Sequence, residues 1–299
     1  MTREKQDAFL RLHLAVLIAG GTGLFGRLVT IGELPLVTFR VVLGAAILWC
    51  VMASRQRARR VGESLARLSR RLLLQIMFCG VLLSIHWVFY YGSIKAANVS
   101  IGAVCFALVG FFTAIVEPLV CRHRPSWREL ALGAFSVISI GFIFGLDPRY
   151  RWGIVLGVIS SILYTLFSVA SKRVQGSSGV SSSTMLLYEM IGGGIVLTLA
   201  YPFYATLFPD VPIVPSAHDA VMLLLFASVF TSAPFLLQLQ ALRHISAFTV
   251  NLTYNLEPVY TILLAMIIFG EAGELNFSFY LGIAFIIVSV LLQTKTSRN

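Results

Sequence analysis

The sequence predicts an all-α polytopic membrane protein, with ten transmembrane helices arranged as two inverted five-helix repeats around a central cavity. Three observations predict this fold: the composition, the length of the apolar stretches and an internal repeat. Of the 299 residues, 58% are hydrophobic and only 12% are charged, whereas soluble domains have about 25% charged residues. A soluble protein of this composition could not cover its core with polar surface. The chain therefore belongs in a membrane.

Ten apolar stretches each approach the ~20 residues that a helix needs to cross the hydrocarbon core of a bilayer. Because they take up roughly two thirds of the chain, little is left for a domain outside the membrane. We place the spans at residues 10–26, 34–53, 71–92, 96–119, 126–145, 152–171, 181–205, 218–240, 245–269 and 275–293.

The basic residues predict the orientation of the chain. An even number of spans puts both termini on one side, and with the N-terminus inside, most of the 23 lysines and arginines fall in cytoplasmic segments, seven of them between Arg55 and Arg71. The external turns hold only Arg27, Lys95, Arg149 and Arg151. By the positive-inside rule, both termini should be cytoplasmic. The +10 net charge is thus a topology signal and a contact for membrane lipids, and nucleic acid is not an expected partner.

The chain repeats itself at a shift of about 148 residues. The segment 92–97 falls on 240–245, and Phe39-Arg40 falls on Tyr188-Glu189 at a shift of 149. We therefore expect two repeats, residues 1–148 and 149–299. Since five spans is an odd number, the second repeat must be inverted relative to the first, an arrangement typical of transporters with alternating access.

Two opposite charges, Arg40 and Glu189, occupy equivalent positions inside spans of the two repeats. A charge within the membrane is costly and marks a functional site by default. One hypothesis is a structural ion pair between the two residues, with Arg40 as a structural or gating residue. The other is that Glu189 faces the cavity and binds the substrate or a proton.

A third charge, Glu257, is followed by Pro258 in the middle of the ninth span. Proline removes a backbone donor, so the sequence predicts a kink at Pro258. Asn251, Tyr254 and Glu257 would form a polar patch at mid-depth that binds the substrate. A purely structural role for Glu257 at a broken helix remains the alternative.

Polar aromatic residues complete the candidate substrate site. His86 and Tyr90 share one face of the third span, and Tyr164 in the sixth span lies among serines. Each can pack between helices instead, but a ring with a polar tip suits a ligand with an aromatic or apolar side chain. The glycine runs 20–23 and 192–194 predict close helix contacts. The four cysteines have no C-x-x-C spacing, no catalytic motif is present, and we expect neither metal nor cofactor.

Several short motifs give the chain a family resemblance over essentially its whole length. These are Leu34-Pro35 followed by Phe39-Arg40, Glu257-Pro258, and the Phe269-Gly270-Glu271 that closes the ninth span. With ten spans and a five-plus-five repeat, the chain resembles the EamA branch of the drug/metabolite transporter superfamily. The first repeat departs from the pattern: Gly110 stands where Pro258 stands in the second, and Arg122-His123 replace Gly270-Glu271.

The resemblance implies a bacterial inner-membrane exporter of aromatic and other apolar amino acids and related small metabolites, working by alternating access. We expect the protein to act as a monomer. One alternative is a carrier of nucleotide sugars or other phosphorylated metabolites, for which at least two basic residues should face the cavity, and Arg40 alone is available. Another is a membrane enzyme or scaffold that transports nothing. The sequence leaves open the substrate, any proton coupling, the oligomeric state and the resting conformation.

Overall fold

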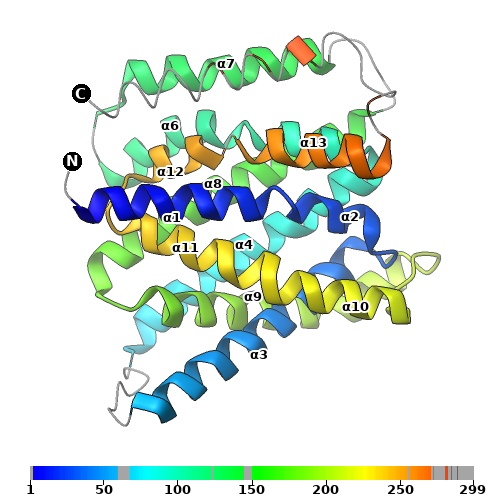
Figure 1. The fold of residues 1–299 in the computed structure, drawn as a ribbon, viewed down its shortest axis with the longest axis horizontal. Helices are drawn as coiled ribbons and strands as arrows, with labels where there is room; N and C mark the ends of the chain where they lie inside the picture. The colour runs from blue at the N-terminus through cyan, green and yellow to red at the C-terminus, as the bar shows by residue number, and fades with distance from the viewer. Residues whose placement is uncertain are drawn as a thin grey trace.

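The computed structural model describes residues 3–59, 68–122, 124–144, 150–254 and 256–270, with a few isolated residues beyond them. All regular structure in these ranges is helical (Figure 1). The elements are α1 (Arg3–Ala19), the 3₁₀ turn η1 (Thr22–Leu24), α2 (Phe25–Leu28), α3 (Glu33–Arg59), α4 (Arg70–Ala96), α5 (Val99–Phe106), α6 (Val109–Cys121), α7 (Trp127–Phe144), α8 (Arg151–Ser178), α9 (Ser182–Leu207), α10 (Ala217–Leu225), the π-helical segment η3 (Phe226–Thr231), α11 (Ser232–Leu242), α12 (Ala247–Tyr254) and α13 (Glu257–Phe269).

Eight helical segments of the described chain are long and apolar enough to cross a membrane. They correspond to the predicted first four spans and to the predicted sixth to ninth. The predicted fifth span, 126–145, is the helix α7, which is not among the eight. The predicted tenth span, 275–293, lies outside the described residues. The chain is thus a multi-pass helical membrane protein, and the count of ten spans remains a prediction.

Helix α4 runs through the middle of the bundle, where it packs along α8 and α9. Helix α3 lies against α9, and α1 lies beside α11 (Figure 1). Helix α7 occupies one edge, where it packs on α6. Segments from both halves of the sequence therefore surround α4, as a central cavity lined by both halves would require.

Large apolar side chains cover the outside of the bundle. Trp127, Trp152, Leu199, Phe203 and Ile267 are each at least 66% exposed. A soluble protein would bury most such side chains, and apolar surface exposed to this extent marks contact with a membrane or a partner. The exposed side chains are therefore the surface that faces lipid.

Two spans break at positions that differ by 148 residues. Helix α5 ends at Phe106 and α6 begins at Val109, and the Leu108 N–H bonds the Cys105 carbonyl at 3.1 Å. In the second half the Leu256 N–H bonds the Thr253 carbonyl, also at 3.1 Å, directly before α13. A tight turn of this type interrupts the regular α-helical ladder. Both spans therefore consist of two half-helices.

The expected kink at Pro258 is thus a complete break. Pro258 is the second residue of α13, where a helix has no intrahelical partner for the backbone N–H that proline lacks. Gly110 is the second residue of α6, so the first half makes the same break without proline. The difference between Gly110 and Pro258 leaves this feature of the backbone unchanged. Helix α13 ends at Gly270, whose φ of 70° favours glycine.

Glycines bring α4 and α9 into direct contact. A Cβ atom on Gly80 would lie 1.7 Å from the Glu189 carbonyl oxygen, and one on Gly193 would lie 1.9 Å from Ser84 Oγ. Both distances are far shorter than a van der Waals contact, so only glycine fits. The predicted close approach at 192–194 is confirmed, and it fixes the position of α4, which carries the largest share of the candidate site.

Candidate functional site

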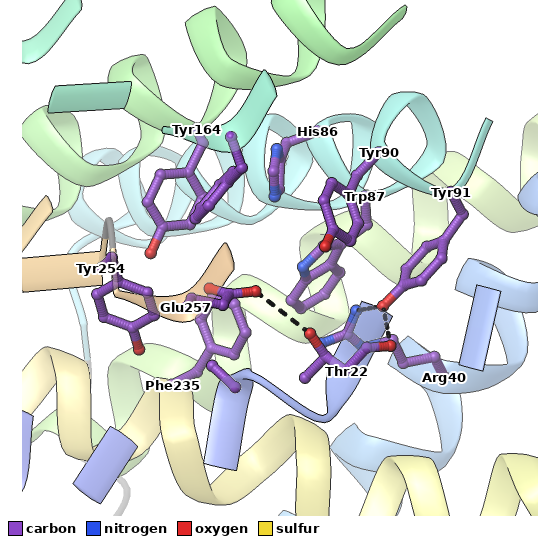
Figure 2. A pocket seen from close by; sticks show the side chains of 12 residues that line it. Thr22, Arg40, His86, Trp87, Tyr90, Tyr91, Tyr164, Phe235, Tyr254 and Glu257 are labelled. Atoms are coloured by element: carbon purple, nitrogen blue, oxygen red, sulfur yellow. Dashed lines mark hydrogen bonds between the residues drawn. The ribbon is translucent and has the colours of Figure 1, made fainter. Parts of the chain in front are cut away.

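A cavity lies where the broken spans meet α4 and α8 (Figure 2). Its walls come from the first and second halves of the chain alike, and seven of the lining side chains are aromatic other than histidine. The lining residues are Ala19, Thr22, Arg40, His86, Trp87, Tyr90, Tyr91, Phe106, Tyr164, Phe235, Tyr254 and Glu257. Rings on neighbouring helices of this lining pack against each other: the centroids of Phe106 on α5 and Tyr164 on α8 are 4.8 Å apart. The cavity lining is therefore a packed aromatic surface, whose rings would have to separate for a ligand to lie between them.

The Arg40 guanidinium is held by two hydrogen bonds and by contacts with aromatic rings. Its Nε donates to Thr231 Oγ1 at 2.8 Å, and its Nη1 donates to the Tyr91 hydroxyl at 3.0 Å. The Cζ atom lies 3.8 Å from the centroid of the Trp87 ring and 4.3 Å from that of Phe226. A guanidinium between two aromatic faces is stabilised by cation–π attraction, which is strongest away from water. The protein thereby holds a full positive charge at the cavity, with only 1% of Arg40 exposed.

Glu257 lies at the start of α13 and points into the cavity (Figure 2). One carboxylate oxygen accepts a long hydrogen bond of 3.4 Å from Thr22 Oγ1. The Thr22 carbonyl in turn accepts from the Tyr91 hydroxyl at 3.3 Å, and Tyr91 accepts from Arg40. Glu257 and Arg40 therefore line the same cavity without bonding each other. The carboxylate is held loosely, whereas the guanidinium is held tightly.

His86 reaches the cavity from α4. Its Nδ1 lies 2.9 Å from the Ser160 carbonyl oxygen and 2.8 Å from Ser160 Oγ. Because a carbonyl oxygen only accepts, the short contact assigns a proton to Nδ1. In the neutral ring, Nε2 is then an acceptor. The ring also packs against Tyr164, with centroids 4.9 Å apart, so His86 both packs and presents a polar atom.

The three tyrosines of the predicted site differ in how their hydroxyls are used. Tyr164 donates to Gln238 Oε1 at 2.9 Å. The hydroxyls of Tyr90 and Tyr254 are buried and have no hydrogen-bond partner in the described structure. Buried polar atoms are nearly always paired in proteins, so two unpaired hydroxyls at one cavity mark a place where a polar ligand can bind.

Two predicted site residues lie outside the cavity. Glu189 accepts from Ser171 Oγ at 2.8 Å, between α8 and α9, and the ion pair expected between Glu189 and Arg40 is not formed. Asn251 accepts from Ser168 Oγ and donates to Thr113 Oγ1, both at 2.9 Å. Asn251 thus ties α12 to α8 and α6. Its contacts, like those of Glu189, are with neighbouring helices.

The structure also adds cavity residues that the sequence did not single out for this site: Ala19, Thr22, Trp87, Tyr91, Phe106 and Phe235. Thr22 lies inside the glycine run 20–23, where α1 ends and η1 begins. Trp87 and Tyr91 are on the same helix as His86 and Tyr90, and the helical period would have placed Trp87 and Tyr91 on one face. Phe106 ends the half-helix α5, a break that no proline signals.

Comparisons with known proteins agree with this architecture. The chain of a solved crystal structure aligns with this protein at a TM-score of 0.73 and 17% sequence identity. The alignment covers 99% of this chain and 99% of the chain in that structure. Two bacterial relatives are named as uncharacterized transporters. The transporter YxxF of Bacillus subtilis (strain 168) is 21% identical, over 92% of this chain and 86% of the relative's length. A transporter of Clostridium kluyveri is 22% identical, over 75% of this chain and 73% of the relative's length.

A shorter match links the chain to a eukaryotic carrier. The GDP-fucose transporter 1 of Dictyostelium discoideum is 32% identical over 84 residues, which is 27% of this chain and 22% of that protein. A family model, that of the EamA-like transporter family, matches residues 8–145 and again residues 151–294. Because these two matches together span nearly the whole chain, this protein belongs to the EamA-like transporter family.

Proposed function

We propose that this protein exports amino acids with aromatic or other apolar side chains across the bacterial inner membrane, by alternating access of the cavity described above. The observation that carries the proposal is the pair of opposite charges, Arg40 and Glu257, which line one aromatic cavity without bonding each other. An amino acid brings a carboxylate, an ammonium group and a side chain. The cavity offers a cation, an anion and aromatic surface.

The two charges are suited to different parts of such a substrate. Glu257 has one long hydrogen bond, so its carboxylate can turn to an ammonium group at little cost. Tyr164 and Tyr254 lie beside it (Figure 2), and aromatic faces attract cations. Arg40 keeps Nε and Nη1 for Thr231 and Tyr91, and its charge favours a carboxylate nearby. The unpaired hydroxyls of Tyr90 and Tyr254 can bond either group.

The alternative substrate is a nucleotide sugar, which the short match to a GDP-fucose transporter favours. A diphosphate carries at least two negative charges and would be bound by several basic side chains. Among the residues that the structure describes, Arg40 is the sole lysine or arginine that lines this cavity, and Glu257 would repel a phosphate. Lys95 and Lys172, which are partly buried, bond backbone carbonyls elsewhere. The charge balance of the cavity supports the zwitterion.

In this proposal the two matched regions act as inverted repeats, with both termini in the cytoplasm and the protein working as a monomer. The equivalent breaks at Leu108 and Leu256 support the repeat. Half-helices at corresponding sequence positions of two halves are what inverted-repeat carriers use around a central site.

Counterflow in proteoliposomes tests the substrate class. Vesicles that contain only this protein are loaded with unlabelled phenylalanine and then given labelled phenylalanine, 3-phenylpropanoate or GDP-fucose outside. We expect saturable uptake of phenylalanine alone, and a five- to thirty-fold weaker apparent affinity in Glu257→Gln, as loss of one charged contact worth about 1–2 kcal/mol implies. Tyr188→Phe, which removes a tyrosine outside the cavity, serves as the matched control. Uptake of GDP-fucose in vesicles loaded with it, but not of phenylalanine, would replace the proposal with its alternative.

A further inference from the structure

Two buried carboxylates, Asp219 and Glu117, bind backbone of the other half of the chain at opposite ends of the bundle. We infer that these contacts are latches, one for each end of the cavity, and that the transport cycle releases them one at a time. The inference rests on the proposed carrier function, but it concerns residues that lie outside the substrate cavity.

The first latch joins α10 to the segment after α2. Asp219 Oδ1 accepts from the Thr30 N–H at 2.7 Å, and Oδ2 accepts from Thr30 Oγ1 at 2.8 Å. Asp219 also accepts from the Ser216 N–H at 3.0 Å, as part of the capping box that begins α10. A second cross-link, from the Gly32 N–H to the Pro212 carbonyl at 2.8 Å, lies close by. Asp219 has no exposed surface.

The second latch joins α6 to the beginning of α12. Glu117 Oε1 accepts from the Ala247 N–H at 3.1 Å, and Oε2 accepts from the Phe248 N–H at 2.7 Å. These amides belong to the first turn of α12, which has no intrahelical partners for them. In the connection that leads from α11 to α12, Lys172 donates to the carbonyls of Leu242 and Ile245. The connection between α11 and α12 is thus bound by Lys172 at its beginning and by Glu117 at its end.

The two latches have opposite directions. Asp219, from the second half of the sequence, holds Thr30 of the first half, whereas Glu117, from the first half, holds α12 of the second. Helices α2 and α10 meet at the right of Figure 1, and α6 and α12 lie toward the left. One carboxylate therefore closes each end of the bundle, and each reaches from one half to the other.

Each latch acts on a segment that also forms the cavity. Thr30 follows η1 and α2, and η1 contains Thr22, which bonds Glu257. Helix α12 contains Tyr254 and leads directly to the break before Glu257. Movement of Thr30 or of the beginning of α12 therefore moves a wall of the cavity. An interaction shifts a conformational equilibrium only if it differs between the two states. Both carboxylates meet this condition if opening one end of the cavity separates the carboxylate at that end from the backbone it binds.

Accessibility of a cysteine in the cavity tests the inference without any substrate. Ala19→Cys is introduced on a background without native cysteines, and its rate of reaction with a membrane-impermeant maleimide is measured in right-side-out and inverted vesicles. We expect Asp219→Asn to raise the rate about threefold or more from the side of α10 and to lower it from the other side. Glu117→Gln should have the opposite effect, because each variant removes a contact that favours one closed end.

Matched controls neutralise acids that make no contact between the halves of the bundle. Asp210→Asn, at an exposed position near the same end as Asp219, and Asp7→Asn, at an exposed position on α1, should leave both rates unchanged. Should a neutralised variant fail to fold, Thr30→Val removes one bond of the first latch and keeps the Ser216 cap. Glu117→Asp shortens the second latch so that it no longer reaches both amides.

The outcomes separate this inference from the proposed substrate. Folded latch variants that leave both labelling rates unchanged, or that change them from the same side, overturn the latches even if phenylalanine is transported. Opposite shifts together with no phenylalanine counterflow keep the latches and reject the substrate. In both cases size-exclusion chromatography confirms that the labelled protein is folded.

Discussion

The rings of Trp87 and Phe235 meet edge to face, with centroids 4.9 Å apart, and the two residues are 148 positions apart in the sequence. This separation is the shift of the predicted repeat. In a protein with a pseudo-twofold axis, a residue can contact its own counterpart only close to that axis. The contact therefore supports the proposed repeat, whose axis would then pass the wall of the aromatic cavity, where the Arg40 guanidinium lies on the face of Trp87.

Arg40→Lys should destabilise the protein. An ammonium group cannot stack as a plane between Trp87 and Phe226 while donating to both Thr231 and Tyr91. We expect a loss of about 2–3 kcal/mol from the weakened stacking and one lost hydrogen bond. The melting temperature of the detergent-solubilised protein measures the effect. A variant as stable as the wild type would show that the contacts of Arg40 contribute little to folding.

Two tyrosine-to-phenylalanine variants should separate folding from binding. Tyr164→Phe leaves Gln238 Oε1 without its donor and should lower stability by about 1 kcal/mol. Tyr254→Phe removes a hydroxyl that has no partner, so stability should stay equal or rise, while the apparent affinity for phenylalanine falls. Thermal melting and counterflow on the same preparations measure both quantities. The reverse pattern would mean that Tyr164, not Tyr254, offers its hydroxyl to the substrate.

Gly80→Ala should prevent α4 and α9 from packing at their present distance. The added methyl group would overlap the backbone of Glu189, and backbone cannot rotate away as a side chain can. Gly176→Ala is the control, because a Cβ there meets nothing within 4 Å, and alanine favours the helix. We expect Gly80→Ala to reduce the yield of monodisperse protein severalfold and Gly176→Ala to maintain it. Equal yields would show that the two helices separate easily.

Much of the fold follows from hydropathy alone, because each helix must satisfy its own backbone in lipid. Eight of the ten predicted spans coincide with helices long and apolar enough to cross. The break before α6 was not predicted, since Ala107 and Leu108 are ordinary helix formers and only tertiary packing interrupts the helix there. The break before α13 was predicted as a kink, with a broken helix as the alternative, because Pro258 is compatible with a kinked helix and with the start of a new one.

The sequence identifies polar side chains that are costly to bury in a membrane. It does not identify whether such a side chain lines the cavity or bonds a neighbouring helix. Arg40, Glu257, His86, Tyr90, Tyr164 and Tyr254 were all singled out, and all line the cavity. Glu189 and Asn251 are equally polar, yet Ser171, Ser168 and Thr113 satisfy them between helices. Sequence position gives the depth of a polar residue but not the direction in which its side chain points.

The predicted orientation can be tested at two described surface positions. Ser177 lies at the end of α8 and Asp210 lies after α9, and both are exposed. With both termini in the cytoplasm, Asp210→Cys should react with an impermeant maleimide in intact cells. Ser177→Cys should react only after the membrane is permeabilised. The opposite labelling pattern would invert the topology, and with it the assignment of export.

The central claim is that the cavity around Arg40 and Glu257 binds an amino acid, and ligand protection of Ala19→Cys tests it most directly. Ala19 lines this cavity, so a bound substrate must shield a cysteine there. The measurement is the rate of maleimide labelling of purified Ala19→Cys protein with and without saturating phenylalanine, with GDP-fucose and 3-phenylpropanoate in parallel. We predict that phenylalanine slows labelling severalfold, that the other two compounds do not, and that Glu257→Gln abolishes the protection. Equal rates with and without phenylalanine, in protein that still labels at Ala19→Cys, would contradict the claim.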